Sequence, residues 1–134
     1  MNKYIYLIIL LLPPSIALGE QCNQNEAIEA ESTAAYIKSW NKLEEHYVSF
    51  GHCDDGAIAE GYSESVSYLM ENNWPEFLSY KMELPFFNFV KKHIDETWGA
   101  DRLKKVAQLA SNHCNKAKEA ICVRIQEIDL NSPK

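Results

Sequence analysis

The chain has 134 residues, 46% of them hydrophobic, and a formal net charge of −6. This length provides one domain with a hydrophobic core and is too short for two. The excess of acidic side chains disfavours nucleic acid and an anionic membrane surface as partners.

The N-terminal segment 1–19 has the pattern of a secretory signal peptide. Lys3 is followed by nine consecutive apolar residues (4–12), a double proline (13–14) and a small-residue cleavage site that ends at Gly19. Cleavage after Ala17 fits the pattern as well. Spanning a bilayer takes roughly 20 apolar residues, so this run is too short for a membrane anchor.

The sequence therefore predicts an exported protein whose single domain covers residues 20–134. Gln21 precedes the first cysteine, where bacterial lipoprotein processing requires a small residue, so no lipid anchor is expected. We expect a periplasmic protein if the source is bacterial, an extracellular one otherwise, and no stable membrane anchoring.

The even number of cysteines in an exported chain of this size predicts two disulfides. No C-x-x-C pair is present, which disfavours a structural zinc site, and no metal or cofactor is expected. The four cysteines are Cys22, Cys53, Cys114 and Cys122.

Helical spacing of apolar residues runs from Ile37 to Phe50 and predicts a first helix that ends at Gly51 and that could begin as early as about residue 26. A second helix begins after Asp54 and Asp55, two residues suited to cap it, and stops before Trp74. A short piece follows over 75–82.

A fourth predicted helix begins at Pro85 and continues through Phe86, Val90, Ile94 and Trp98 to Gly99. A fifth begins at Asp101, and a last helix carries Ala117 to Ile128. No segment alternates as a half-buried strand does. The prediction is an all-α bundle of five or six helices.

A single helix over 26–50 would also restrict the disulfides. It would be ~38 Å long and would place Cys22 and Cys53 at opposite ends, whereas a disulfide needs Cα atoms within ~7 Å. This disfavours Cys22–Cys53, and the other pairings tie both residues to the C-terminal helices. A break near Ser32, a good helix cap, would instead let the N-terminal arm fold back.

Charge is unevenly distributed along the predicted domain. Residues 20–83 contain 13 acidic and 3 basic side chains, whereas 84–134 contain 6 and 9. Solvated acidic helix faces would explain this, and so would a protein partner with a cationic surface. The candidate partner-binding residues are Asp54, Asp55, Glu60 and Glu64.

No catalytic signature is present, and the i, i+4 pair Glu60 and Glu64 is more typical of a solvated helix face than of an acid–base pair. We therefore expect a protein that is not an enzyme. Gly61, inside a helix, indicates a close approach by a neighbouring helix or a partner. A group of aromatic residues is expected to form a buried central helix, or to line an apolar ligand cavity or partner patch: Phe86, Phe87, Phe89 and Trp98.

The segment 51–63, GHCDDGAIAEGYS, resembles part of short uncharacterised exported proteins of proteobacteria. The leader, size, helical pattern and cysteines are similar to those of the Rap/Tai class of periplasmic immunity proteins, which neutralise cell-wall amidase toxins delivered by type VI secretion. The resemblance implies a non-enzymatic inhibitor and carries over no site residue. The alternative is a helical carrier of a small apolar ligand.

Overall fold

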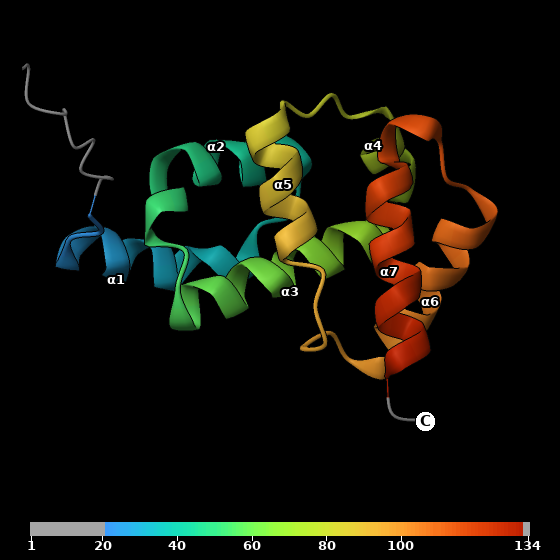
Figure 1. Cartoon of the computed structure of the whole chain (residues 1–134). Coiled ribbons are helices and arrows are strands. Elements are labelled where there is room, and N and C mark those ends of the chain that lie inside the picture. Colours follow the sequence, from blue (N-terminus) through green and yellow to red (C-terminus); the bar gives the residue numbers. More distant parts are fainter. Residues whose placement is uncertain (1–20, 133–134) are drawn as a thin grey trace, which may run out of the picture.

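The computed structural model describes residues 21–132, so the predicted signal peptide lies outside the described residues. Within that range the fold is all-α and contains no strand, as predicted, but it has seven α-helices rather than five or six (Figure 1). None of these helices is long and apolar enough to cross a membrane. The helices are α1 (Gln24–Thr33), α2 (Trp40–Phe50), α3 (Gly56–Asn72), α4 (Trp74–Ser79), α5 (Leu84–Lys92), α6 (Ala100–Asn112) and α7 (Glu119–Asn131), with 3₁₀ turns η1 (Ala34–Tyr36), η2 (Gly51–Cys53) and η3 (Lys116–Lys118).

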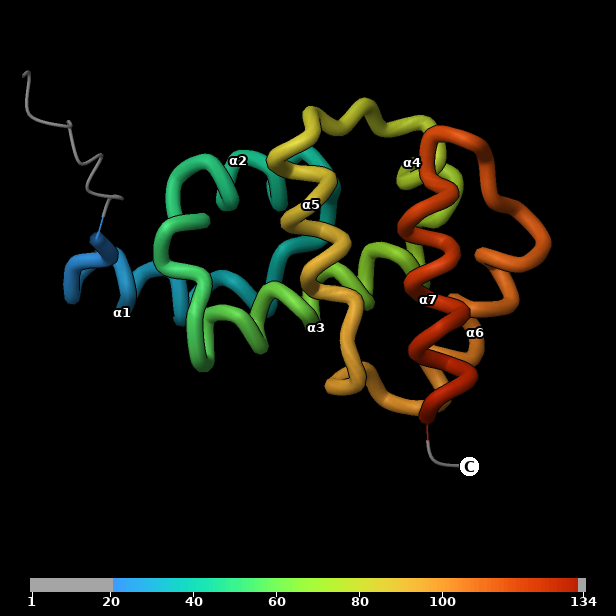
Figure 2. The backbone as a smooth tube through the Cα atoms, in the orientation of Figure 1, coloured from blue at the N-terminus to red at the C-terminus, as the bar shows by residue number. Residues whose placement is uncertain are grey.

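The longest helix, α3, connects the two ends of the molecule. It contacts α1 and η1 at one end and α4 and α6 toward the other. The backbone trace shows α1 and α2 at the blue and cyan end, and α6 beside α7 at the orange and red end (Figure 2). Because nine of its residues are buried, α3 forms the centre of the core rather than one wall of it.

The predicted helix over 26–50 is broken, and a serine of α3 stabilises the break. After η1 the chain is extended at Ile37 and Ser39, and α2 then starts in a new direction. The buried hydroxyl of Ser65 donates to the Ala34 carbonyl and accepts from the Ile37 amide at 3.2 Å. These bonds satisfy backbone groups that the break would leave unpaired in the core.

The break makes the prediction against Cys22–Cys53 wrong. Because α2 folds back along α1, Cys53 in η2 returns to Cys22 just before α1, with Cα atoms 4.9 Å apart. The second disulfide joins Cys114, after α6, to Cys122 in α7. Each disulfide therefore cross-links residues at one end of the molecule, and neither joins the N-terminal half to the C-terminal half.

Helix α5 ends at Lys92, although the predicted helix continued to Gly99. Ile94 and Trp98 are buried as the spacing indicated, but they lie in a loop. Side chains replace the helical hydrogen bonds there: Asp95 accepts from the Thr97 amide at 2.9 Å, and the Trp98 indole donates to the His93 carbonyl at 3.0 Å. Local bonds of this kind compete with the helix.

Candidate functional site

Four polar side chains from three separate segments meet beside α3, and we call them the buried polar network: Asp54, Ser63, His93 and Asp95. His93 Nε2 lies 3.0 Å from Asp54 Oδ2, and His93 Nδ1 lies 3.1 Å from Ser63 Oγ. The Ser63 hydroxyl donates to Asp95 Oδ2 at 2.7 Å. The network connects the residue after η2, the middle of α3 and the loop after α5.

The Asp54 carboxylate of this network is buried, but two basic side chains compensate its charge. Lys92 Nζ lies 2.7 Å from Asp54 Oδ2, so this oxygen faces both a lysine and His93. Burial alone would raise the pKa of Asp54, but the hydrogen bonds from His93 and Lys92 outweigh it and hold that pKa below its ordinary value. The carboxylate is therefore ionised and paired. Its other oxygen, Oδ1, is buried and has no hydrogen-bond partner among the described residues.

The distances in the network are those of a serine nucleophile, a histidine base and an orienting aspartate. The Ser63 hydroxyl, however, donates its only proton to Asp95, so that proton is not directed at His93. Ser63 and His93 are only 3% and 2% exposed. The network thus joins segments of the fold and presents no free nucleophile.

A surface pocket of about 300 Å³ lies beside Ser63. Ser63 belongs to both the pocket lining and the network. Its lining residues come from α3 and from the loop before α6: Glu60, Ser63, Glu64, Ser67, Thr97 and Trp98.

Arg102 of α6 orders one side of this pocket. Its guanidinium lies 2.9 Å from Glu64 Oε1 and 3.0 Å from Glu71 Oε2, and it donates to Ser67 Oγ at 2.8 Å. Lys105 adds a bond to Glu71, and the bonds from Lys105 and Arg102 lower the pKa of Glu71 despite its slight desolvation. The Glu64 side chain therefore has one ion-pair partner, Arg102, although it is 51% exposed.

The four predicted acidic residues take different positions. Asp55 is exposed and caps α3, accepting from the Gly56 amide at 2.8 Å, and Glu60 and Glu64 line the pocket. The Asp54 side chain is only 7% exposed and does not cap the helix, because it faces Lys92 and His93. The exposed acidic residues are therefore Glu60 and Glu64, on one side of α3, and Asp55 at its N-terminal end; we call these three residues together the α3 acidic face.

The predicted aromatic group lies in the core. Phe86, Phe89 and Trp98 are buried, and Phe87 is half-buried. The Phe89 ring lies 4.8 Å from the Tyr62 ring and 5.9 Å from that of Phe86, centre to centre. These rings fill the space between α3 and α5 with contacts to one another.

One group of potential metal ligands occurs in the described range: Cys22, Glu26 and Cys53. The two sulfurs form a disulfide and offer no thiolate. Glu26 lies 3.2 Å from His52 Nε2 and accepts from the Asn23 amide at 3.0 Å, and these bonds lower its pKa. The group therefore fastens the start of α1 to η2.

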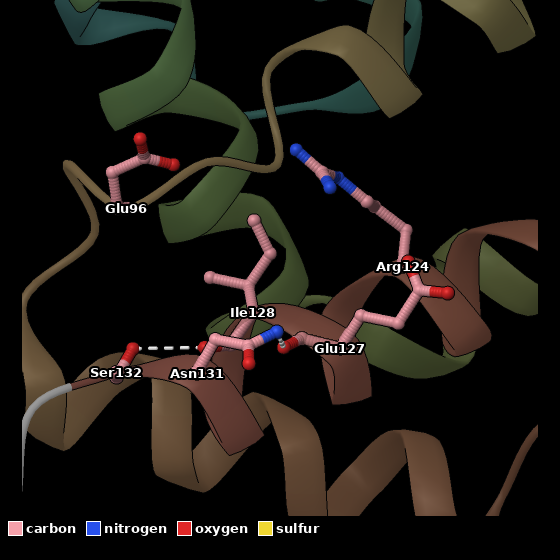
Figure 3. A pocket seen from close by; sticks show the side chains of 6 residues that line it. All are labelled: Glu96, Arg124, Glu127, Ile128, Asn131 and Ser132. Atoms are coloured by element: carbon pink, nitrogen blue, oxygen red, sulfur yellow. Dashed lines mark hydrogen bonds between the residues drawn. The ribbon is translucent and has the colours of Figure 1, made fainter.

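A larger open pocket of about 630 Å³ lies beside α7 (Figure 3). It is bordered by Glu96, Arg124, Glu127, Ile128, Asn131 and Ser132. Three of its polar side chains are bonded within the fold: Arg124 Nε donates to the Ile94 carbonyl, and Asn131 and Ser132 donate to carbonyls of α7. These side chains fix the loop after α5 and the end of α7.

Comparisons with protein-family models, with curated proteins and with solved structures give no match to this chain. The candidate site thus rests on its own geometry. Sequence reasoning identified Glu60 and Glu64 but missed His93, Asp95 and Arg102. The pair His93-x-Asp95 was visible, yet only the fold brings it to Ser63, 30 residues earlier.

Proposed function

We propose that this protein is a non-enzymatic binding protein of an exported compartment, and that its α3 acidic face docks on a cationic surface of a protein partner. The observation that carries the proposal is that two of these three carboxylates have no ion-pair partner. Among residues 21–132, Asp55 and Glu60 form no ion pair, whereas Glu64, one turn after Glu60, pairs with Arg102. A partner would find an ordered surface with unneutralised charge.

The charge distribution supports the same proposal. The helices α1 to α3 belong to the half of the chain with 13 acidic and 3 basic side chains. A field of one sign accelerates encounter with an oppositely charged surface and makes association sensitive to ionic strength. The binding geometry then depends on the pocket at Glu60 and Glu64.

Within this proposal, the partner is a secreted cell-wall-degrading toxin and the protein is its periplasmic immunity protein or inhibitor. The resemblance to the Rap/Tai class supports this choice, together with the small, doubly disulfide-bonded helical scaffold. Periplasmic expression of the protein encoded beside this one, with and without this chain, tests it. Growth arrest that this chain relieves would support the immunity role, and growth unaffected by either protein would exclude that neighbour as the toxin.

Capture from an envelope extract of the source cells tests the binding face. Immobilised wild type is compared with Asp55→Lys/Glu60→Lys, and with Glu29→Lys/Glu31→Lys as the control, because both control positions are exposed on α1. We expect a captured protein that the α3 variant loses, that the α1 variant retains, and that salt releases. Capture unaffected by the α3 variant and by salt would contradict the proposal.

A further inference from the structure

A continuous series of bonds leads from the Cys22–Cys53 disulfide to the pocket. Cys53 ends η2, and the next residue, Asp54, is bound to His93. His93 contacts Ser63, which is one of the residues that line the pocket. The disulfide is thus one residue away from the network beneath the α3 acidic face.

The loop that closes the pocket depends on the same histidine. The indole of Trp98, which lines the pocket, donates to the His93 carbonyl at 3.0 Å. Asp95 accepts from Ser63 and from Thr97, and Thr97 is another lining residue. Displacement of Asp54 would remove one of the two side-chain contacts that hold the His93 ring, and His93 also supplies the backbone carbonyl that binds the Trp98 indole.

The second disulfide provides a natural contrast. Cys114–Cys122 joins the α6–α7 turn, and neither cysteine is adjacent in sequence to a residue of the buried polar network. It has its own tryptophan neighbour: the Trp74 indole donates to the carbonyl of His113, the residue before Cys114, at 3.0 Å. Trp74 and Trp98 are buried alike, 4% and 5% exposed.

We propose that the Cys22–Cys53 disulfide positions the pocket of the α3 acidic face, and that it acts through Asp54. A covalent bond keeps η2 against the start of α1, and this fixes the point from which the Asp54 side chain enters the core. The Cys114–Cys122 bond has no part in this arrangement. The inference rests on the proposed function only for the use of the pocket, since the coupling itself is a property of the free protein.

Hydrogen exchange of the indole N–H groups, followed by NMR on the free protein, tests the coupling. In Cys22→Ser/Cys53→Ser we expect the Trp98 indole to exchange faster by about tenfold to a hundredfold, the change expected for losing one charge-assisted hydrogen bond, and that of Trp74 to be unchanged. In Cys114→Ser/Cys122→Ser we expect the reverse. Equal acceleration of both indoles in the first variant, or none at Trp98, would overturn the proposal.

The substitution Asp54→Asn, with both disulfides intact, tests whether the disulfide acts through Asp54. It should accelerate exchange at Trp98 and leave Trp74 unchanged, and it should add little when combined with Cys22→Ser/Cys53→Ser, because both changes release the same contact. Fully additive effects would show that the disulfide acts by another route. This variant also keeps the test decisive if the chain without Cys22–Cys53 does not fold. Because no partner is present, failure of the coupling is distinguished from failure of the proposed binding function.

Discussion

Substitution of Gly61 by alanine tests the close approach of η1 to α3. In an open helix this change would stabilise the protein by about 1 kcal/mol, because alanine has the higher helix propensity. Here the added Cβ would lie 2.9 Å from Ala34 Cβ and 3.1 Å from the Ala35 backbone nitrogen. Overpacking of this kind costs about 1–3 kcal/mol, and the upper part of that range applies because one neighbour is backbone. The net expectation is a loss of about 1–2 kcal/mol.

Urea unfolding followed by far-UV circular dichroism measures this loss as a lower midpoint with an unchanged slope. Gly99→Ala is the matched control, since its Cβ would meet no atom within 4 Å. Adding Ala34→Gly to Gly61→Ala should cost less than the two single changes summed, because it removes the nearest atom. A Gly61→Ala protein as stable as the wild type, or more stable, would refute the reasoning.

Three further predictions concern stability. The two disulfides close loops of different length, with sequence separations of 31 and 8. Removal of Cys22–Cys53 should therefore lower the free energy of unfolding by about 4 kcal/mol, and removal of Cys114–Cys122 by about 2.5 kcal/mol. Equal losses in denaturant titrations would contradict this. Asp54→Ala should cost about 2 kcal/mol, because the buried His93 ring nitrogen loses its hydrogen-bond partner, against about 1 kcal/mol for the capping residue in Asp55→Ala, and thermal unfolding compares them. Burial lowers the pKa of His46 from 6.5 in spite of the Glu29 charge. The stability that neutral His46 contributes is therefore complete above pH 6.5 and is lost as the pH falls through the lower folded-state pKa. The free energy of unfolding should fall less on acidification in His46→Gln, and the same pH dependence in both proteins would count against this assignment.

Much of the fold followed from sequence periodicity. The all-α class, the start of α3 at Asp55 and the tight contact at Gly61 were predicted and are confirmed. The break after Thr33 was not predicted as the leading case, because its cause is not local. Gly61 and Ser65 admit and bind η1, and both lie more than twenty residues further along the chain.

The residues of the candidate site, too, were only partly predictable from the sequence. Glu60 and Glu64 were identified because i, i+4 spacing on a helix is visible in the sequence. The burial of Asp54 was not, because its partners Lys92 and His93 lie 38 and 39 residues away. A cap position and an ion-pair position look alike until the tertiary contacts are known, and here the aspartate next to the capping residue forms the ion pair.

The most direct test of the α3 acidic face is the rate at which the captured partner associates with it, measured by surface plasmon resonance at low and at physiological ionic strength. We expect association to slow as salt rises, and Asp55→Lys/Glu60→Lys to slow it further at low salt, while Glu29→Lys/Glu31→Lys has a smaller effect. Dissociation should be faster only in the α3 variant, since only that variant alters the contact itself. Association and dissociation rates that are the same in both variants and insensitive to salt would contradict the account.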